Sequence, residues 1–184
     1  SSPTRRFSDL VQFASNPTPS LVYMQYGPSL PAFREIGKEA TNGMLYATLV
    51  GCLQDEIGTA FEKRYKAKFG PDAGHNSGAQ SYDGAMVWAT AAALAGGSGE
   101  PDNADQNRKV ADRMRSMIHR GVTGTTRFDP AAQAAYTFPT QTNDPSLGMP
   151  HQFLQIQDFN KGPVLIAPAP YGTGKFMLPP WIKS

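Results

Sequence analysis

Two glycine-containing stretches are the first places where this sequence could do chemistry. GVTGTTRFDP (121–130) has two glycines three residues apart, and GTGK (172–175) resembles part of a phosphate-binding loop. Such a loop leads directly into a helix, whose first backbone N–H groups bind the phosphate. Neither stretch precedes a helical pattern, so the first is interpreted as a turn and the second is rejected as a phosphate-binding loop. Gly121 is expected to cap a helix, Gly124 to allow a turn before a short strand, and Asp129 to start the next turn.

The other reactive side chains do not form a catalytic or metal-binding set. Cys52 is the one cysteine, and its apolar neighbours favour a buried small side chain over a nucleophile. His75, His119 and His151 lack the spacing of metal ligands. Ser81 lacks the G-x-S-x-G context of a hydrolase nucleophile. We therefore expect no enzyme activity, no metal and no cofactor.

Composition indicates a folded protein of modest charge. The 184 residues are 40% hydrophobic and 17% charged, with a formal net charge of +2, which disfavours disorder. The cluster of basic residues from Lys63 to Lys68 suits a solvated helix face, so no nucleic-acid partner is expected. No apolar run approaches the length of a membrane span.

Hydrophobic periodicity predicts five helices. The alanine-rich one is apolar enough to indicate close packing against another helix or a sheet. Turn residues end several of them, with Gly70 and Gly121 placed as terminating glycines. The predicted helices span residues 5–15, 31–37, 54–69, 81–97 and 107–121.

Strands are predicted at both ends of the chain. Residues 20–26 and 42–51 are rich in β-branched and aromatic side chains, and 152–170 alternate around Asn160-Lys161-Gly162 as a hairpin does. Residues 131–150 look irregular. The order is mixed α/β without a regular βαβ run, which indicates a piece of an α/β protein.

Aromatic and hydroxyl side chains are the remaining candidates for function. At strand ends or helix starts they offer apolar area together with one hydrogen bond, which suits a ligand cleft. Packing is the preferred interpretation of Tyr46 and Trp88, whereas for Tyr26 and Tyr82 packing and ligand contact both stay open.

Three segments taken together resemble one family. Residues 81–97, 121–130 and 153–170 look like the C-terminal half of type I periplasmic binding proteins, in particular the leucine/isoleucine/valine-binding-like receptors of ABC transporters. Residues 42–49 and the amphipathic stretch 61–70 also fit in order and spacing.

The resemblance implies an α/β fold of the periplasmic-binding-protein-like I class, with a parallel sheet, helices on both faces and a partial two-lobe architecture. Residues 1–51 would end lobe two, 52–140 would form the second half of lobe one, and 141–184 would form the return crossover and hairpin. Two hinged lobes would capture a small molecule in the periplasm and present it to a membrane permease. A ligand-sensing receptor or regulator on the same fold is the alternative.

The implied ligand-binding residues are Tyr26, Gly27, Ser81 and Tyr82. Tyr26 falls where amino-acid-binding members often carry an acidic residue that pairs with the ligand ammonium group. A phenol cannot neutralise a cation, so amide, aromatic or carboxylate solutes are expected beside amino-acid-like ones. Tyr82 resembles a family aromatic residue at the cleft mouth.

The chain is short for this family. A partial two-lobe fold is expected to expose apolar strand edges and helix faces. We expect it to be completed by a missing N-terminal segment or by a second copy.

Overall fold

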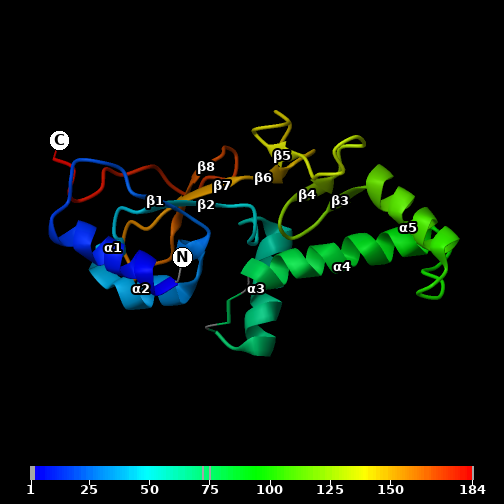
Figure 1. Cartoon of the computed structure of the whole chain (residues 1–184), viewed down its shortest axis with the longest axis horizontal. Coiled ribbons are helices and arrows are strands. Elements are labelled where there is room, and N and C mark those ends of the chain that lie inside the picture. The colour runs from blue at the N-terminus through cyan, green and yellow to red at the C-terminus, as the bar shows by residue number, and fades with distance from the viewer. Residues whose placement is uncertain (1–2, 72, 75, 184) are drawn as a thin grey trace. The chain divides into compact units, whose positions relative to one another are not determined.

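The chain forms two compact units in a computed structural model that describes residues 3–71, 73–74 and 76–183 (Figure 1). The first unit combines Ser1–Thr48 with Gln152–Ser184, and the second is Leu49–His151. The chain therefore leaves the first unit after Thr48 and returns at Gln152, whereas the sequence placed these limits at residues 51 and 140. The assignment of the units to receptor lobes stays a prediction.

The first unit is a small sheet with short helices. Its α2 helix coincides with the predicted range and begins at Pro31, whose fixed φ suits the first helical position. The helices are α1 (Pro3–Ser15), α2 (Pro31–Gly37) and the 3₁₀ turns η1 (Gly27–Ser29) and η2 (Lys38–Thr41), and the strands are β1 (Tyr23–Gln25), β2 (Leu45–Thr48), β7 (Gln152–Gln155) and β8 (Val164–Ala167).

The strand order β1-β2-β7-β8 gives a mixed sheet. β1 and β2 are parallel, as expected, but β7 runs antiparallel to both β2 and β8. The direction of β7 follows from chain connectivity, because β2 leads out of this unit and β7 leads back into it. The predicted hairpin is confirmed, with Leu154 opposite Leu165 and Gln155 opposite Val164.

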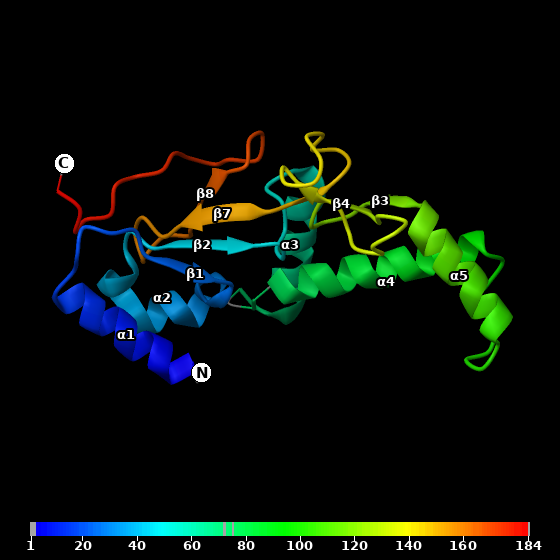
Figure 2. The same cartoon turned by 45° about the horizontal axis from the view of Figure 1, so that its top comes forward.

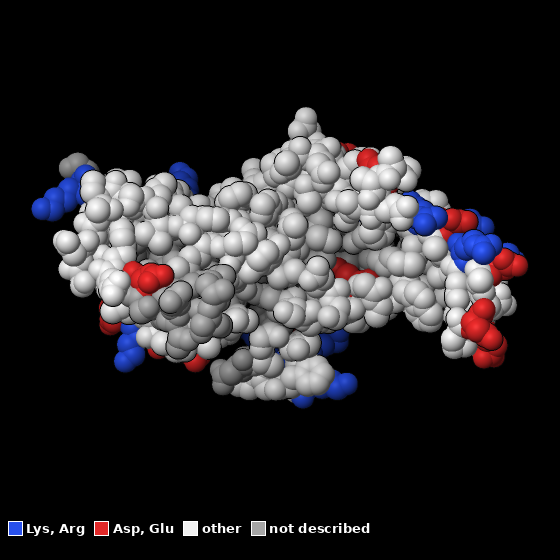
Figure 3. All heavy atoms as spheres, viewed as in Figure 1, with Lys and Arg blue, Asp and Glu red and all other residues white. Residues whose placement is uncertain are grey.

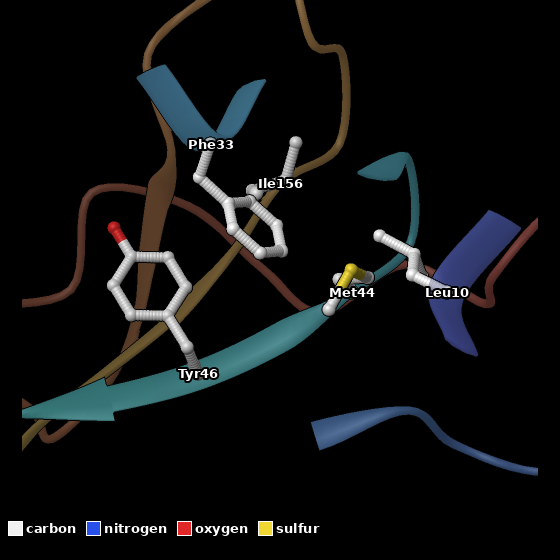
Figure 4. Close-up of a cluster of buried hydrophobic side chains, with 5 residues drawn as sticks. All are labelled: Leu10, Phe33, Met44, Tyr46 and Ile156. Atoms are coloured by element: carbon white, nitrogen blue, oxygen red, sulfur yellow. The ribbon is translucent and has the colours of Figure 1, made fainter. Parts of the chain in front are cut away.

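The core of the first unit lies between the sheet and its helices (Figure 4). Leu10 of α1 and Phe33 of α2 pack with Met44, Tyr46 and Ile156, all of them buried. Tyr46 is 2% exposed, so its predicted packing role is confirmed. Burial of apolar area of this kind is the main stabilising term for such a unit.

The C-terminal segment is fixed to this unit by specific contacts. The Trp181 ring meets Phe13 edge-to-face at a centroid distance of 5.2 Å, and its Nε1 donates to the Ser20 carbonyl at 2.8 Å. The buried Gln155 amide donates to the Met177 carbonyl at 2.7 Å and accepts from the Met177 N–H at 2.9 Å. These contacts hold the C-terminal segment against the first unit.

The second unit is mainly helical (Figure 2). Asp55 caps α3, because its carboxylate accepts from the Gly58 N–H at 2.8 Å and also pairs with Arg120. The elements are α3 (Glu56–Phe69), α4 (Asn76–Leu94), α5 (Ala104–Ser116), β3 (Ile118–Arg120), β4 (Thr125–Arg127), β5 (Thr137–Phe138) and β6 (Met149–Pro150), with the strands paired β3-β4 and β5-β6.

Two predicted boundaries in the second unit are wrong. α4 begins at Asn76 rather than at residue 81, because a polar stretch that reads as a loop forms its first turn. α5 ends at Ser116, and Ile118–Arg120 forms a strand that pairs with Thr125–Arg127. Gly121 therefore lies in a hairpin turn and does not cap the helix.

Candidate functional site

Tyr26 and Gly27 lie at the carboxyl end of β1. Because β1 and β2 are parallel, their carboxyl ends meet at one edge of the sheet, where open α/β sheets generally bind ligands. The Tyr26 N–H donates to the Ala47 carbonyl of β2 at 3.3 Å. The Tyr26 side chain is 42% exposed, and a Cβ added at Gly27 would meet nothing within 4 Å. This edge of the first unit is therefore open around both residues.

The backbone of Tyr26 is strained. Its φ of 54° with ψ of −45° lies outside the regions that residues with a Cβ normally adopt. Such strain costs on the order of 1–3 kcal/mol and concentrates at ligand-binding sites. This backbone conformation turns the chain from β1 into η1, and the exposed phenol lies at the sheet edge.

Two residues at the same edge were not identified from the sequence. Thr48 ends β2 and pairs directly with Gln152, the first residue of β7, so the two side chains share one face of the sheet. Gln152 is only 5% exposed, and within the described part of the chain its Nε2 has no hydrogen-bond partner. The buried Nε2 without a partner draws attention to Gln152, and sequence pattern alone does not show burial.

Replacing Gln152 with methionine is expected to raise the free energy of unfolding by about 1 kcal/mol. A buried amide N–H group without a partner costs roughly 1–3 kcal/mol, and methionine fills a similar volume without polar atoms. Urea denaturation followed by circular dichroism measures the change. Gln155→Met is the matched control and should be destabilising, because the equally buried Gln155 amide is hydrogen-bonded. A loss of stability in Gln152→Met would contradict the absence of a partner.

Ser81 and Tyr82 lie on α4, both exposed and more than one turn after its start. The Tyr82 ring is 42% exposed and lies 5.0 Å from the Phe61 ring of α3, centroid to centroid. Tyr82 therefore has a packing contact on one side and open surface on the other.

The four predicted ligand-binding residues belong to different compact units. Tyr26 and Gly27 are in the first unit, and Ser81 and Tyr82 are in the second. Their joint contact with one ligand stays a prediction.

Asp83 is the most connected polar side chain of α4. It is 3% exposed, and its carboxylate accepts from the N–H groups of Val122 and Thr123 at 2.9 and 2.8 Å and from the Thr123 hydroxyl at 2.6 Å. A Cβ added at Gly121 would lie 2.3 Å from this carboxylate. The Asp83 carboxylate therefore leaves no room for a side chain at position 121, whose glycine was predicted to cap a helix.

The rest of the 121–130 stretch is structural, as predicted. Gly124 has a φ of +124° and turns the chain into β4. The Asp129 carboxylate accepts from the N–H groups of Ala131 and Ala132, both at 2.8 Å, and from the Tyr136 hydroxyl at 2.9 Å. These hydrogen bonds lower the pKa of Asp129. The carboxylate therefore builds the next turn.

The GTGK stretch also forms a turn. The N–H groups of Thr173 and Gly174 donate to the Leu165 carbonyl at 2.8 and 3.3 Å, and the Leu165 N–H donates to the Thr173 hydroxyl at 3.1 Å. The N–H groups of Thr173 and Gly174 are therefore bonded to β8 and are not free to bind a phosphate.

Cys52 is buried, as predicted. Burial, with added repulsion from the carboxylates of Glu62, Asp83 and Asp55, raises the pKa of its thiol to about 12. The thiolate, which is the nucleophilic form, is therefore scarce at neutral pH.

A thiol–disulfide reagent is expected to modify Cys52 at least about a hundredfold more slowly in the folded chain than in denaturant at pH 8. The folded pKa lies above the unfolded one, so the thiol's contribution to stability is complete below about pH 8.5 and declines as the pH rises toward 12. Absorbance of the released thiolate measures the rate, with Cys52→Ser as the unreactive control. Equal rates in the folded and unfolded chain would contradict burial.

The histidines do not gather with other metal-ligating side chains in the described residues. His119 lies in β3 and His151 directly precedes β7, and both are half-buried. His75 lies outside the described residues.

Comparison with solved structures identifies the fold. Over 97% of its length the chain is 51% identical to a candidate branched-chain amino acid ABC transporter from Silicibacter pomeroyi, with a TM-score of 0.90. It also matches a periplasmic binding protein type 1 from Bordetella pertussis over 87% of its length, with a TM-score of 0.58 at 17% identity. This chain has the type I periplasmic binding protein fold.

The predicted resemblance is confirmed by the match to the Silicibacter pomeroyi structure, and a further solved structure shares the fold. A leucine binding protein from Thermotoga maritima matches 88% of the chain with a TM-score of 0.59 at 19% identity. The chain spans 45% of the Silicibacter pomeroyi structure and 41% of each of the other two, which is less than half of a binding protein. In the described residues, no helix is both long and apolar enough to cross a membrane. No family model and no curated protein matches the sequence.

Proposed function

We propose that this chain is part of a solute-binding component of an ABC importer that works outside the cytoplasm. The observation that carries the proposal is the 51% identity to the Silicibacter pomeroyi transporter protein over 97% of this chain. Ligand capture needs shape and hydrogen bonds, and no chemical step is assigned to any residue. The partners are a small molecule and a membrane permease.

The open edge at Tyr26 supports a solute contact in the first unit. Its phenol offers apolar area and one hydrogen bond. It brings no negative charge, so an amide, an aromatic compound or a carboxylate suits this position as well as an amino acid does.

A thermal-shift screen with amino acids, simple amides and aromatic carboxylates tests the proposal. One solute class is expected to raise the melting temperature, because a ligand that binds only the folded state stabilises it. No shift with any of the three classes would contradict solute binding by this chain.

Replacing Tyr26 with alanine is expected to weaken binding of that solute about tenfold, through the loss of one hydrogen bond and of apolar contact. Calorimetric titration measures the affinity. Tyr23→Ala is the matched control, because Tyr23 is a similarly exposed tyrosine of β1, at 48% against 42%. Equal losses in both variants would place the solute elsewhere.

A further inference from the structure

The second half of α3 concentrates positive charge on one exposed side. Lys63, Arg64 and Lys68 are exposed, and their spacing places them on the same side of the helix. We call these three residues the α3 basic face. Within the described residues, none of the three forms an ion pair with a carboxylate. Lys66 differs from them, because its Nζ lies 2.5 Å from the Glu62 carboxylate.

The helix dipole does not account for the whole α3 basic face. Basic residues are favourable in the last turn of a helix, near the unpaired backbone carbonyls, but this effect falls off within that turn. α3 ends at Phe69, so Lys68 lies in the last turn. Lys63 and Arg64 lie more than one turn before the end. Their charges are therefore not explained by stabilisation of the helix.

The charges of α5 are arranged differently. Arg108 pairs with Asp105 and Arg115 pairs with Asp112, both at 3.0 Å. In Figure 3 basic and acidic side chains are mixed over α5, whereas the lower end of α3 shows basic ones without acidic ones beside them. Asp72, which follows α3 in the sequence, lies outside the described residues. Paired opposite charges largely cancel at a distance, so α3 presents a stronger positive field than α5 does.

An exposed aromatic ring adjoins the α3 basic face. Phe69 is 59% exposed, and the Lys68 Nζ lies 5.4 Å from the centre of its ring. The same ring packs on Tyr65 with a centroid distance of 4.7 Å, which restrains its position. α4 also exposes an aromatic residue, Trp88 at 50%, which corrects the predicted packing role of Trp88, but α4 contains no basic residue. α3 therefore combines cations with an exposed ring, and α4 does not.

Cations beside an exposed aromatic ring fit an anionic lipid surface. Lys and Arg attract acidic headgroups, and aromatic rings are favoured at the boundary between headgroups and acyl chains. Two of the three cations are lysines, whose ammonium group is a point charge on a flexible stem, and this suits a diffuse layer of phosphates. The fixed carboxylates of an acidic polypeptide would be matched better by several bidentate arginines.

We propose that the α3 basic face and Phe69 form a docking surface for an anionic phospholipid bilayer. The three cations would lie among the lipid phosphates, with the Phe69 ring at the level of the headgroups. The contact is peripheral, because no segment needs to cross the bilayer. It requires no solute, so it goes beyond the proposed function and does not depend on it.

Cosedimentation of the full chain with lipid vesicles, without any solute, tests the proposal. Vesicles of equal parts phosphatidylglycerol and phosphatidylcholine should bind the chain at least about tenfold more tightly than phosphatidylcholine vesicles, and about 0.5 M salt should remove the difference. The triple variant Lys63→Gln, Arg64→Gln, Lys68→Gln should bind about a hundredfold more weakly, since each basic residue contributes about fivefold. Equal binding to both kinds of vesicle would overturn the proposal.

A matched variant controls for net charge. Arg108→Gln, Lys109→Gln, Arg113→Gln removes three exposed cations of α5 and lowers the net charge by the same amount. It should weaken vesicle binding by less than about threefold, because attraction to the bilayer falls off within a Debye length. Both variants should keep the melting temperature within about 2 °C, because surface substitutions change stability little. Equal losses of binding in the two variants would show attraction by net charge alone and would overturn the proposal.

Competition distinguishes a bilayer from other anions. Poly-glutamate at the same concentration of negative charge should leave most of the chain on the vesicles, because it offers no apolar layer for Phe69. Displacement of most of the chain would assign the α3 basic face to an acidic polypeptide and would overturn the proposal. Displacement by inorganic phosphate at constant ionic strength would show a site for a free phosphate group, which would also overturn it.

Discussion

Replacing Asp83 with alanine is expected to lower the free energy of unfolding by about 3–5 kcal/mol. The carboxylate is 3% exposed and accepts three hydrogen bonds from Val122 and Thr123. Its removal leaves two backbone N–H groups buried without acceptors, each costing about 1–3 kcal/mol. For a chain of this length the melting temperature should fall by about 10 °C, which circular dichroism would detect.

Two further variants make the Asp83 prediction specific. Asp112→Ala removes an exposed aspartate that pairs with Arg115, and it should change stability by less than about 0.5 kcal/mol. Gly121→Ala would place a Cβ 2.3 Å from the Asp83 carboxylate, so it should disrupt the same contact. The double variant Asp83→Ala, Gly121→Ala should then be less destabilised than the sum of the single changes. Strict additivity would contradict a shared contact.

Replacing Gly58 with alanine is expected to lower the free energy of unfolding by about 3 kcal/mol or more. The new Cβ would lie 2.1 Å from the Leu53 carbonyl oxygen and 2.9 Å from the Leu53 nitrogen, and backbone atoms cannot move away as a side chain can. Leu53 is fully buried, and its N–H donates to the Val122 carbonyl at 3.0 Å. The clash would therefore separate the start of α3 from the loop that Asp83 holds.

Gly84→Ala is the matched control for Gly58→Ala. Gly84 lies in the middle of α4, and a Cβ there would meet nothing within 4 Å. Alanine should raise stability by about 0.5–1 kcal/mol through its higher helix propensity. Thermal denaturation of both variants measures the difference, and a Gly58→Ala chain as stable as the original would refute the close approach.

Local sequence pattern was sufficient to predict elements that are determined by residues close together in the sequence. Pro31 at the first helical position and Gly70 after the last turn of α3 mark helix ends, and both were found. The hairpin of β7 and β8 was predicted from the alternation around Asn160-Lys161-Gly162, and the register confirms it.

Long-range contacts account for what the pattern missed. Ile118 has helical spacing after Met114, yet it lies in β3 because the hairpin turn is bonded to Asp83, about 40 residues earlier. Trp88 suggested packing by its type and by the apolar helix around it, but the described residues supply no layer to cover it. Gln152 was not identified from the sequence, because its burial depends on residues that are distant in the sequence.

The candidate site was only partly accessible to sequence reasoning. Tyr26 was identified by its position at a strand end, and its strained backbone and open surroundings support that choice. Gly27 shares the open edge. Ser81 and Tyr82 belong to the other unit, so their part in the same site remains a prediction.

The most direct test of solute capture without chemistry is calorimetric titration of the chain with the solute class found by thermal shift, followed by mass spectrometry of the recovered solute. Saturable binding of one molecule per chain and recovery of the solute unchanged are expected. Conversion of the solute into a product, or no saturable binding by any of the three classes, would contradict it.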